Sequence, residues 1–267
     1  MTTRFLDLPD GRLAYDDQGE GPLIVATPAM LDLRSELRFL VPRLVAAGFR
    51  VVTLDQRGMG ETSGEWPEYG SAPLAHDLAA LIRHLDSGPA IIYGTSNGAA
   101  AGVYVAAEWP ELVRGLVLAA PFVRDGRMSW IQRRLMSIMR IPFLTLPIYM
   151  SYFPKWEPRR PRTSDFDQHV AALKANLNEP SRRGVITAYL LQQTHREAEA
   201  RLGRVRVPSL VIMGTGDVDW PDPEAEARWI ASQLGSEVLM LDGAGHHPHV
   251  EYQDEVADAV RAFAQRA

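Results

Sequence analysis

The chain has 267 residues, of which 46% are hydrophobic and 23% are charged, and its formal net charge is −5. This composition is that of an ordinary globular protein and excludes a disordered chain, a collagen-like repeat or a disulfide scaffold. Because the sequence contains no cysteine, thiol nucleophiles, cysteine-ligated zinc and iron–sulfur clusters are excluded as well. The acidic balance, without a basic run interleaved with aromatic residues, argues against nucleic-acid binding.

The apolar segments predict neither a signal peptide nor a membrane span. Residues 1–9 are interrupted by charge and proline before an apolar stretch of signal-peptide length can form. The longest apolar stretch, 141–153, is shorter than the ~20 residues of a spanning helix and contains Pro142 and Pro147. We therefore predict a cytoplasmic protein without stable membrane insertion. A homodimer is compatible with the sequence.

Strand and helix patterns alternate along most of the chain. Two alternating runs around Pro9-Asp10-Gly11 predict a hairpin. After it, short apolar runs predict strands and amphipathic segments predict helices. The predicted strands are 23–26, 51–54, 90–93, 116–119, 209–213 and 238–241, and the predicted helices are 35–47, 71–85, an alanine-rich segment ending at 109–110, 222–234 and a final segment around 256–263. Apolar strands alternating with helices predict an α/β protein whose mostly parallel sheet carries helices on both sides.

The segment from 122 to 202 interrupts this alternation. Its patterns predict helices over 128–139, 165–177 and 182–200, around a proline-broken stretch from 141 to 161. We interpret the segment as a helical cap over one end of the sheet, so that 1–121 and 203–267 form the core. Its methionine and aromatic side chains form either the cap's own core or an apolar pocket, because flexible thioethers adapt to irregular ligands.

The sequence Gly94-Thr95-Ser96-Asn97-Gly98 has the form G-x-S-x-G and lies between a predicted strand and a predicted helix. Its two glycines permit the strained turn that exposes a serine at such a junction. A serine hydroxyl is a weak nucleophile and needs an adjacent base that is oriented by an acid. A nucleophilic Ser96 therefore requires a histidine and a carboxylate at the same edge of the sheet.

Two further loops supply these groups. Asp217 follows the predicted strand that ends at Met213, and His246 follows the strand that ends at Leu241. Loops after parallel strands gather at the carboxyl edge of the sheet, where folds of this kind bind ligands. We therefore expect Ser96, Asp217 and His246 to converge there.

With these motifs in register, the chain resembles the α/β-hydrolase fold superfamily, and within it the serine esterases with a helical cap. Residues 55–62, Asp-Gln-Arg-Gly-Met-Gly-Glu-Thr, are similar to the family's D-x-R-G-x-G-x-S loop after the fourth strand. The resemblance extends over essentially the whole chain and implies a mostly parallel, eight-stranded sheet. It also implies that Ser96 is the nucleophile, His246 the general base and then acid, and Asp217 the orienting carboxylate, without a cofactor.

One position departs from the family pattern. The family usually has His-Gly after the third strand, where this chain has Ala26-Thr27-Pro28-Ala29-Met30. One oxyanion-hole donor is expected to be the N–H of Asn97, the residue after the nucleophile. The other is the N–H of Met30, which we favour, or that of Ala29, whereas Pro28 has no N–H. The expected substrate-binding residues are Ala29 and, in the cap, Trp130, Met136, Met139, Phe143 and Tyr149.

Other polar residues are weaker candidates for the site. Asp219 and Asp125 are fallback positions for the acid, and His247 is a fallback base. Three charged residues, Asp32, Arg34 and Glu36, lie beside the oxyanion loop, 26–30, and could bind a polar group of the substrate. A solvated loop is the preferred interpretation. Because the histidines show no recognisable metal-ligand spacing, no metal site is predicted.

The sequence favours a cofactor-independent serine hydrolase that cleaves a carboxylic ester, lactone or thioester with an apolar portion, through an acyl-serine intermediate. The expected partner is therefore an apolar, ester-like small molecule. Fold and triad do not determine what attacks the acyl group, so an acyltransferase, perhydrolase or lyase is an alternative. A small-molecule receptor that retains the triad is another, because the oxyanion loop departs from the family pattern.

Overall fold

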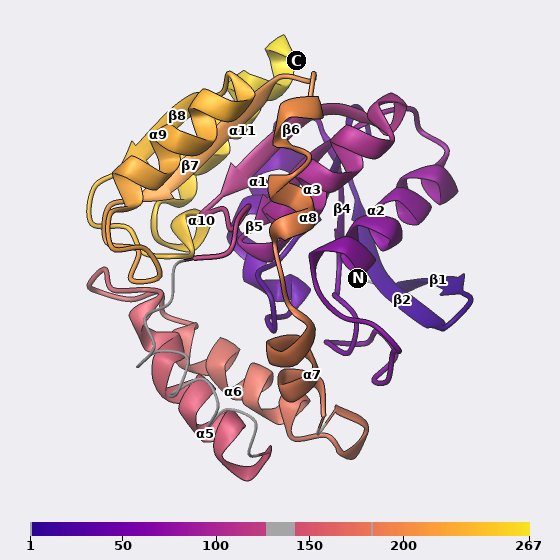
Figure 1. Ribbon diagram of the computed structural model, residues 1–267, viewed down its shortest axis with the longest axis vertical. Coiled ribbons are helices and arrows are strands. Elements are labelled where there is room, and N and C mark those ends of the chain that lie inside the picture. The colour runs from indigo at the N-terminus through magenta and orange to yellow at the C-terminus, as the bar shows by residue number, and fades with distance from the viewer. Residues whose placement is uncertain (1, 127–141, 183) are drawn as a thin grey trace.

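The computed structural model describes residues 2–126, 142–182 and 184–267, and its centre is an eight-stranded sheet (Figure 1). The strands are β1 (Arg4–Leu8), β2 (Gly11–Gln18), β3 (Leu23–Thr27), β4 (Arg50–Leu54), β5 (Ala90–Thr95), β6 (Val113–Ala119), β7 (Ser209–Gly214) and β8 (Glu237–Leu241). Their order is β1-β2-β4-β3-β5-β6-β7-β8. The pairs β1/β2 and β2/β4 are antiparallel, and all other neighbours are parallel. The predicted hairpin and mostly parallel sheet are confirmed.

Helices cover both faces of this sheet, as predicted. The α-helices of the described residues are α1 (Leu40–Ala46), α2 (Ser71–Leu85), α3 (Asn97–Glu108), α5 (Pro142–Tyr152), α6 (Phe166–Leu177), α7 (Val185–Gln192), α8 (Arg196–Glu199), α9 (Pro223–Leu234), α10 (Pro248–Glu251) and α11 (Gln253–Arg266). The helices α1 and α11 contact each other and share one apolar cluster with the sheet. The helices α2, α3, α8 and α9 contribute to the cluster on the opposite face.

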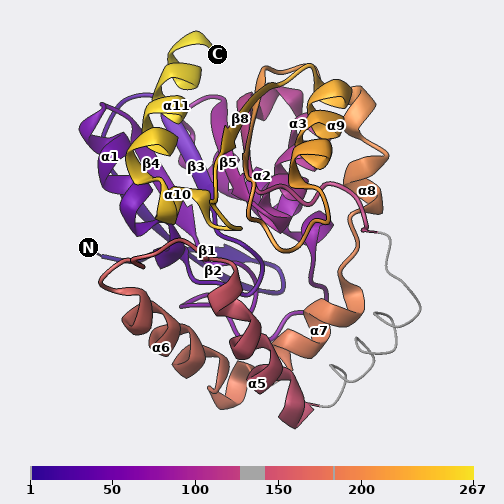
Figure 2. The same cartoon turned by 90° about the vertical axis from the view of Figure 1, so that its left-hand side faces the viewer.

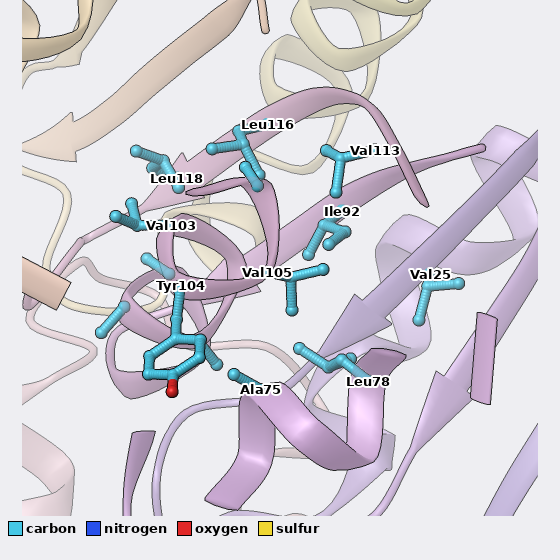
Figure 3. Packing of buried hydrophobic residues seen from close by; sticks show 14 of the residues in the cluster. Val25, Ala75, Leu78, Ile92, Val103, Tyr104, Val105, Val113, Leu116 and Leu118 are labelled. Carbon is cyan, nitrogen blue, oxygen red and sulfur yellow. The ribbon is translucent and has the colours of Figure 1, made fainter. Parts of the chain in front are cut away.

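Successive residues of a strand enter the two apolar clusters alternately. In β5, Ile91 lies in the cluster with α1 and α11, and Ile92 lies in the cluster with α2 and α3. Figure 3 shows Ile92 among Leu78 of α2, Val105 of α3 and Val25 of β3. All are fully buried, and burying each such side chain stabilises the fold by about 1.5–3 kcal/mol. Burial on both faces explains why the strands are continuous apolar runs in the sequence.

The predicted helix over 35–47 is only partly α-helical. Its first part, Arg34–Phe39 (η1), is a 3₁₀ helix, and the α-helix α1 begins at Leu40. Pro42 explains the late start, because proline has no N–H to donate to an earlier carbonyl and fits best in the first turn of a helix.

Two predictions between β6 and β7 also differ from the structure. The single helix expected over 182–200 is divided into α7 and α8, because the backbone at Gln193 turns to an extended conformation with ψ 123°. The stretch expected to be broken by prolines, 141–161, begins with the helix α5. Pro142 takes the first position of α5, where the missing N–H has no partner to lose, and Pro147 lies inside the helix.

The helices α5, α6 and α7 lie together at one end of the molecule (Figure 2), whereas α8 returns to pack against α3. Side chains of α5–α7 form a third apolar cluster with Leu31, Met59 and Trp66 from loops of the sheet layer. The division into a core of 1–121 and 203–267 and a cap of 122–202 remains a prediction. None of the helices in the described ranges combines the length and the apolar character that crossing a bilayer requires.

Candidate active site

Ser96 stands at the sharp turn between β5 and α3. Its backbone has φ 55° and ψ −114°, which is strained for a residue with a side chain. The Ser96 N–H donates to the carbonyl of Ala119 at 2.9 Å, which ties the turn to the end of β6. A Cβ at Gly94 would collide with the backbone of Gly98, and one at Gly98 would lie 2.6 Å from Thr27 Cγ2. Only glycine therefore fits on either side of the serine.

The hydroxyl of Ser96 lies at the amino end of α3, and the residue is 8% exposed. Within the described part of the chain this hydroxyl has no hydrogen-bond partner. It is therefore free to transfer its proton to a base and to attack an electrophile that reaches it.

Asp217 and His246 form a buried pair at the ends of β7 and β8. The Nδ1 of His246 lies 2.8 Å from Oδ2 of Asp217. We assign the imidazole proton to Nδ1, which then donates to the carboxylate and leaves Nε2 as the acceptor. Burial lowers the pKa of His246, but the negative charges of Asp217 and Asp219 outweigh it and raise the pKa above the ordinary 6.5.

A second carboxylate lies next to the same imidazole. Oδ2 of Asp219 is 3.5 Å from His246 Nδ1. Tyr152 Oη donates to Asp219 Oδ1 at 3.0 Å, and Trp156 Nε1 donates to Oδ2 at 2.9 Å. Burial and the nearby charge of Asp217 raise the pKa of Asp219 despite the opposing effect of His246. The shorter contact belongs to Asp217, which agrees with the order in which the sequence ranked the two acids.

Phe122 contacts both sides of the site. Its N–H donates to the carbonyl of Ser96 at 3.3 Å, and its ring centroid lies 5.8 Å from that of His246. The ring also stacks on Trp220 at 4.6 Å. Phe122 thus contacts Ser96 and His246 at the carboxyl edge of the sheet.

Met30 and Asn97 each present a backbone N–H that has no acceptor among the described residues. The N–H of Ala29 is occupied, because it donates to Glu36 Oε2 at 2.7 Å. Leu31, the next residue but one, has φ 64°, and its carbonyl accepts from Tyr149 Oη at 3.1 Å. The geometry thus favours Met30 and Asn97 as the two oxyanion-hole donors.

A polar network behind Asn97 was not found from the sequence. Gln193 Nε2 donates to Asn97 Oδ1 at 2.7 Å, and Asn97 Nδ2 donates to Gln56 Oε1 at 3.4 Å. Gln193 Nε2 also lies 2.7 Å from Nε2 of His195. Burial lowers the pKa of His195 to about 4, although Asp125 opposes the effect. The position of Gln56 inside the D-x-R-G loop was the only sequence signal that pointed toward this network.

Several charged residues occupy other places than the sequence suggested. Asp32 and Glu36 are each 1% exposed, so the interpretation as a solvated loop is wrong. Arg34, from the same loop, forms ion pairs with three acidic residues, Asp16, Asp55 and Glu61. Asp125 lies 3.4 Å from Nδ1 of His195 rather than beside His246. Non-local ion pairs of this kind cannot be inferred from local patterns.

The expected substrate-binding residues are only partly described. Ala29 and Tyr149 are buried next to the oxyanion loop. The structure does not describe Trp130, Met136 and Met139, nor the side chain of Phe143. A cavity of about 610 Å³ lies elsewhere, between η1 and α6, with Arg34 and Asn176 in its lining. None of the predicted site residues lines it.

Two groups of described residues have the spacing of metal ligands. One consists of Asp217, Asp219 and His246. In this group Asp217 and His246 contact each other, and Asp219 accepts hydrogen bonds from Tyr152 and Trp156. The other consists of Asp32, Glu36 and His247. It lies beneath the oxyanion loop.

The fold and this constellation define an α/β-hydrolase. More narrowly, the chain belongs to the family described as serine aminopeptidase, S33, whose family model matches residues 28–253. Solved structures with the same fold include a bromoperoxidase from Bacillus anthracis, with a TM-score of 0.84 and 18% identity over 99% of this chain and all of that one. The enzyme Est816, described as degrading N-acyl homoserine lactones, has a TM-score of 0.82 and 19% identity over 97% of this chain and all of that one.

Relatives in sequence include hydrolases of several kinds and a putative non-heme bromoperoxidase of Mycobacterium tuberculosis. A 2-hydroxy-6-oxononadienedioate/2-hydroxy-6-oxononatrienedioate hydrolase of Escherichia coli O81 (strain ED1a) is 27% identical over all of this chain and 96% of its own length. A 2-(acetamidomethylene)succinate hydrolase of Mesorhizobium japonicum is 31% identical over 49% of this chain and 48% of its own. For several curated relatives the matched segment is less than half of the relative's length. Membership of this family supports hydrolase activity in general.

Proposed function

We propose that this protein is a cofactor-independent serine hydrolase that cleaves a carboxylic ester, lactone or thioester with an apolar portion. The observation that carries the proposal is the buried 2.8 Å contact between Asp217 and His246 Nδ1, at the same sheet edge as a serine held at positive φ. A carboxylate on Nδ1 fixes the imidazole so that Nε2 can act as the base. The family membership supports the same reaction type.

In the acylation step, His246 Nε2 takes the proton of the Ser96 hydroxyl while Oγ attacks the carbonyl carbon of the substrate. The negative charge that develops on the carbonyl oxygen is stabilised by the N–H groups of Asn97 and Met30. The tetrahedral intermediate collapses, the bond to the alcohol or thiol breaks, and His246 gives its proton to the leaving group. The acyl group remains bound to Ser96 as an ester.

In the deacylation step, His246 takes a proton from a water molecule that attacks the acyl carbon. Collapse of the second tetrahedral intermediate breaks the bond to Ser96 Oγ, which regains its proton from His246, and releases the carboxylic acid. Asp217 stabilises the imidazolium in both steps without taking the proton. An oxyanion-hole donor contributes roughly 3 kcal/mol to such transition states.

An apolar substrate fits the surroundings of the base. The rings of Phe122, Trp156 and Trp220 are grouped around His246, at centroid distances from it or from each other of 4.6–5.8 Å. Aromatic walls exclude water and bury apolar ligand surface. The cap residues predicted from the sequence, Trp130, Met136, Met139, Phe143 and Tyr149, are proposed to form the rest of the acyl pocket, in a cytoplasmic enzyme.

The proposal is tested with Ser96→Ala and the matched control Thr95→Val. The Thr95 hydroxyl is buried and has no hydrogen-bond partner in the described ranges, so its isosteric replacement removes a neighbouring hydroxyl and no described contact of the site. Ser96→Ala is expected to lower p-nitrophenyl ester turnover by at least about 10³-fold and to abolish labelling by a fluorophosphonate, whereas Thr95→Val retains both. Labelling or turnover that survives in Ser96→Ala contradicts the assignment.

The substrate class is determined with a panel of p-nitrophenyl esters of rising chain length, lactones, thioesters and a 2-hydroxy-6-oxo dienedioate. The last compound is included because of the full-length relative named for it. The proposal expects the free acid as product and kcat/KM that rises with acyl chain length. If added alcohol or peroxide captures the acyl group in place of water, the enzyme is a transferase or perhydrolase rather than a hydrolase.

A further inference from the structure

A group of buried polar atoms without partners lies beneath the oxyanion loop. Asp32 Oδ2 and His247 Nε2 have no hydrogen-bond partner among the described residues, and both residues are 1% exposed. Glu36, which is equally buried, contacts His249, with Glu36 Oε1 3.1 Å from His249 Nε2. The other ring nitrogen of His249, Nδ1, has no partner among the described residues. Polar atoms that are buried and unpaired cost free energy unless an ion or water satisfies them.

The three side chains Asp32, Glu36 and His247 are arranged as ligands of one ion. One ligand atom from each lies within 4.8 Å of the other two, and His247 Nε2 is 4.0 Å from Glu36 Oε2. Ligand atoms at metal distances of about 2.0–2.2 Å lie roughly 3.3 Å apart in a tetrahedral site. Pairs of ligand atoms would therefore need to approach each other by at most about 1.5 Å. His249 Nε2, 3.1 Å from Glu36 Oε1, is the nearest further ligand.

The atoms that point away from this centre are already held by other residues. Asp32 Oδ1 lies 2.9 Å from Nε2 of His169, and His247 Nδ1 lies 3.2 Å from Oε1 of Glu157. Metal-binding histidines in proteins use the second ring nitrogen in this way, and ligating carboxylates are themselves hydrogen-bonded. The inner atoms of Asp32 and His247 have no partner among the described residues while their outer atoms are fixed, which distinguishes this cluster from an ordinary pair of ionised groups.

The neighbouring cluster of Asp217, Asp219 and His246 provides a comparison. It has the same residue types and spacing, but Asp217 and His246 contact each other, and Tyr152 and Trp156 donate to Asp219. None of its polar atoms is among the buried unpaired ones. The spacing of ligand atoms is thus common to both clusters, and the unpaired inner atoms occur only beneath the oxyanion loop.

We propose that Asp32, Glu36 and His247 bind one divalent transition-metal ion, with His249 as the fourth protein ligand. Imidazole together with carboxylate favours Zn²⁺ over Mg²⁺ or Ca²⁺, which prefer oxygen ligands alone. Because Glu36 also accepts the N–H of Ala29, the ion would join the oxyanion loop to the loop that carries His246. Its role is structural, and the site is independent of the reaction proposed above.

The test measures Zn²⁺ binding by the full chain. Wild-type protein is incubated with excess Zn²⁺, dialysed, and analysed by inductively coupled plasma mass spectrometry and by thermal unfolding with Zn²⁺ or Mg²⁺. We expect one equivalent of Zn²⁺ and a rise in the melting temperature that Mg²⁺ does not produce. Glu36→Gln and His247→Phe are each expected to weaken Zn²⁺ binding by at least about 10-fold. Asp219→Asn, from the comparison cluster, is expected to bind Zn²⁺ as the wild type does.

Replacement of Zn²⁺ by Co²⁺ adds a spectroscopic readout, with ligand-field absorption in the wild type that both ligand variants lose. If Glu36→Gln does not fold, the Zn²⁺ affinity of His247→Phe serves as the test of the ligand set. If neither variant folds, the number of Zn²⁺ ions bound per wild-type chain decides the proposal. A wild type without stoichiometric Zn²⁺ overturns the site, and so do variants that bind Zn²⁺ as tightly as the wild type. Either result would leave protonated histidines paired with Asp32 and Glu36 as the explanation of the cluster.

Discussion

The pair of carboxylates beside His246 leads to a graded prediction for the variants Asp217→Asn and Asp219→Asn. Asp217 Oδ2 is 2.8 Å from Nδ1 and Asp219 Oδ2 is 3.5 Å from it. With an effective dielectric constant of ~20, a unit charge attracts an imidazolium by about 6 kcal/mol at the shorter distance and about 5 kcal/mol at the longer one. The two carboxylates therefore differ by only about 1 kcal/mol in their Coulombic attraction to the imidazolium.

The hydrogen bond is the larger difference between the two carboxylates. A bond to a charged group contributes about 1.5–3 kcal/mol, so Asp217→Asn should lose about 3–4 kcal/mol more than Asp219→Asn, or roughly 10²–10³-fold more in kcat. Asp219→Asn keeps the short hydrogen bond and should therefore be the more active of the two single variants. The double variant leaves no carboxylate on Nδ1 and should fall by about 10⁴-fold, as in triads without their acid.

The assay is steady-state hydrolysis of a p-nitrophenyl ester, with Ser96→Ala as the background and circular dichroism as the check on folding. If Asp219→Asn loses as much as Asp217→Asn, the two carboxylates have equal roles and the distance argument fails. If Asp217→Asn alone already reaches the level of the double variant, Asp219 contributes nothing to the imidazolium.

Three further variants test the turn, the buried histidine and the oxyanion loop. Gly94→Ala should lower the free energy of unfolding in urea by about 3 kcal/mol, because the added Cβ collides with backbone atoms. The control Gly203→Ala should change this free energy little, because the added Cβ lies in open space. Equal effects of the two variants would contradict the packing argument. His195 has a folded pKa of about 4, below its ordinary 6.5, so its contribution to the free energy of unfolding, at most about 3 kcal/mol, is present above pH 6.5 and is lost as the pH falls through 4. His195→Phe should make the free energy of unfolding less dependent on pH in this range. An unchanged slope would refute the argument. Tyr149→Phe removes the bond to the Leu31 carbonyl, worth about 1 kcal/mol, and should lower kcat roughly 5-fold with KM unchanged, whereas a change confined to KM would place the hydroxyl in substrate binding.

The parts of the fold that follow from local patterns were predictable from the sequence. The strand 90–93, the G-x-S-x-G turn and the alanine-rich helix are contiguous, and each is encoded by residues within a few positions of one another. The positions of Asp217 and His246 after two parallel strands were enough to place them at the same edge, because strand direction determines which loops meet. The structure brings the two side chains to hydrogen-bond distance.

The contacts that orient this site were not predictable, because they join residues far apart in the chain. Tyr152 and Trp156 reach Asp219 across more than 60 positions, and Gln193 reaches Asn97 across 96. No hydrophobic period or turn signal specifies such pairs. The same limitation explains the wrong interpretation of Glu36, whose charge suggested solvent until the histidine loop was found packed against it.

Glu36 also bears on the choice between Ala29 and Met30 that the sequence left open. The Ala29 N–H donates to a fully buried carboxylate at 2.7 Å. To serve an oxyanion instead, it would have to leave that carboxylate, and breaking a hydrogen bond to a charged group costs about 1.5–3 kcal/mol. This cost is comparable to the roughly 3 kcal/mol that an oxyanion-hole donor supplies, so little catalytic advantage would remain. Among the described residues the N–H of Met30 has no acceptor, so donation to an oxyanion would break no hydrogen bond there. Glu36, which makes Ala29 unsuitable, also fixes the loop that carries Met30.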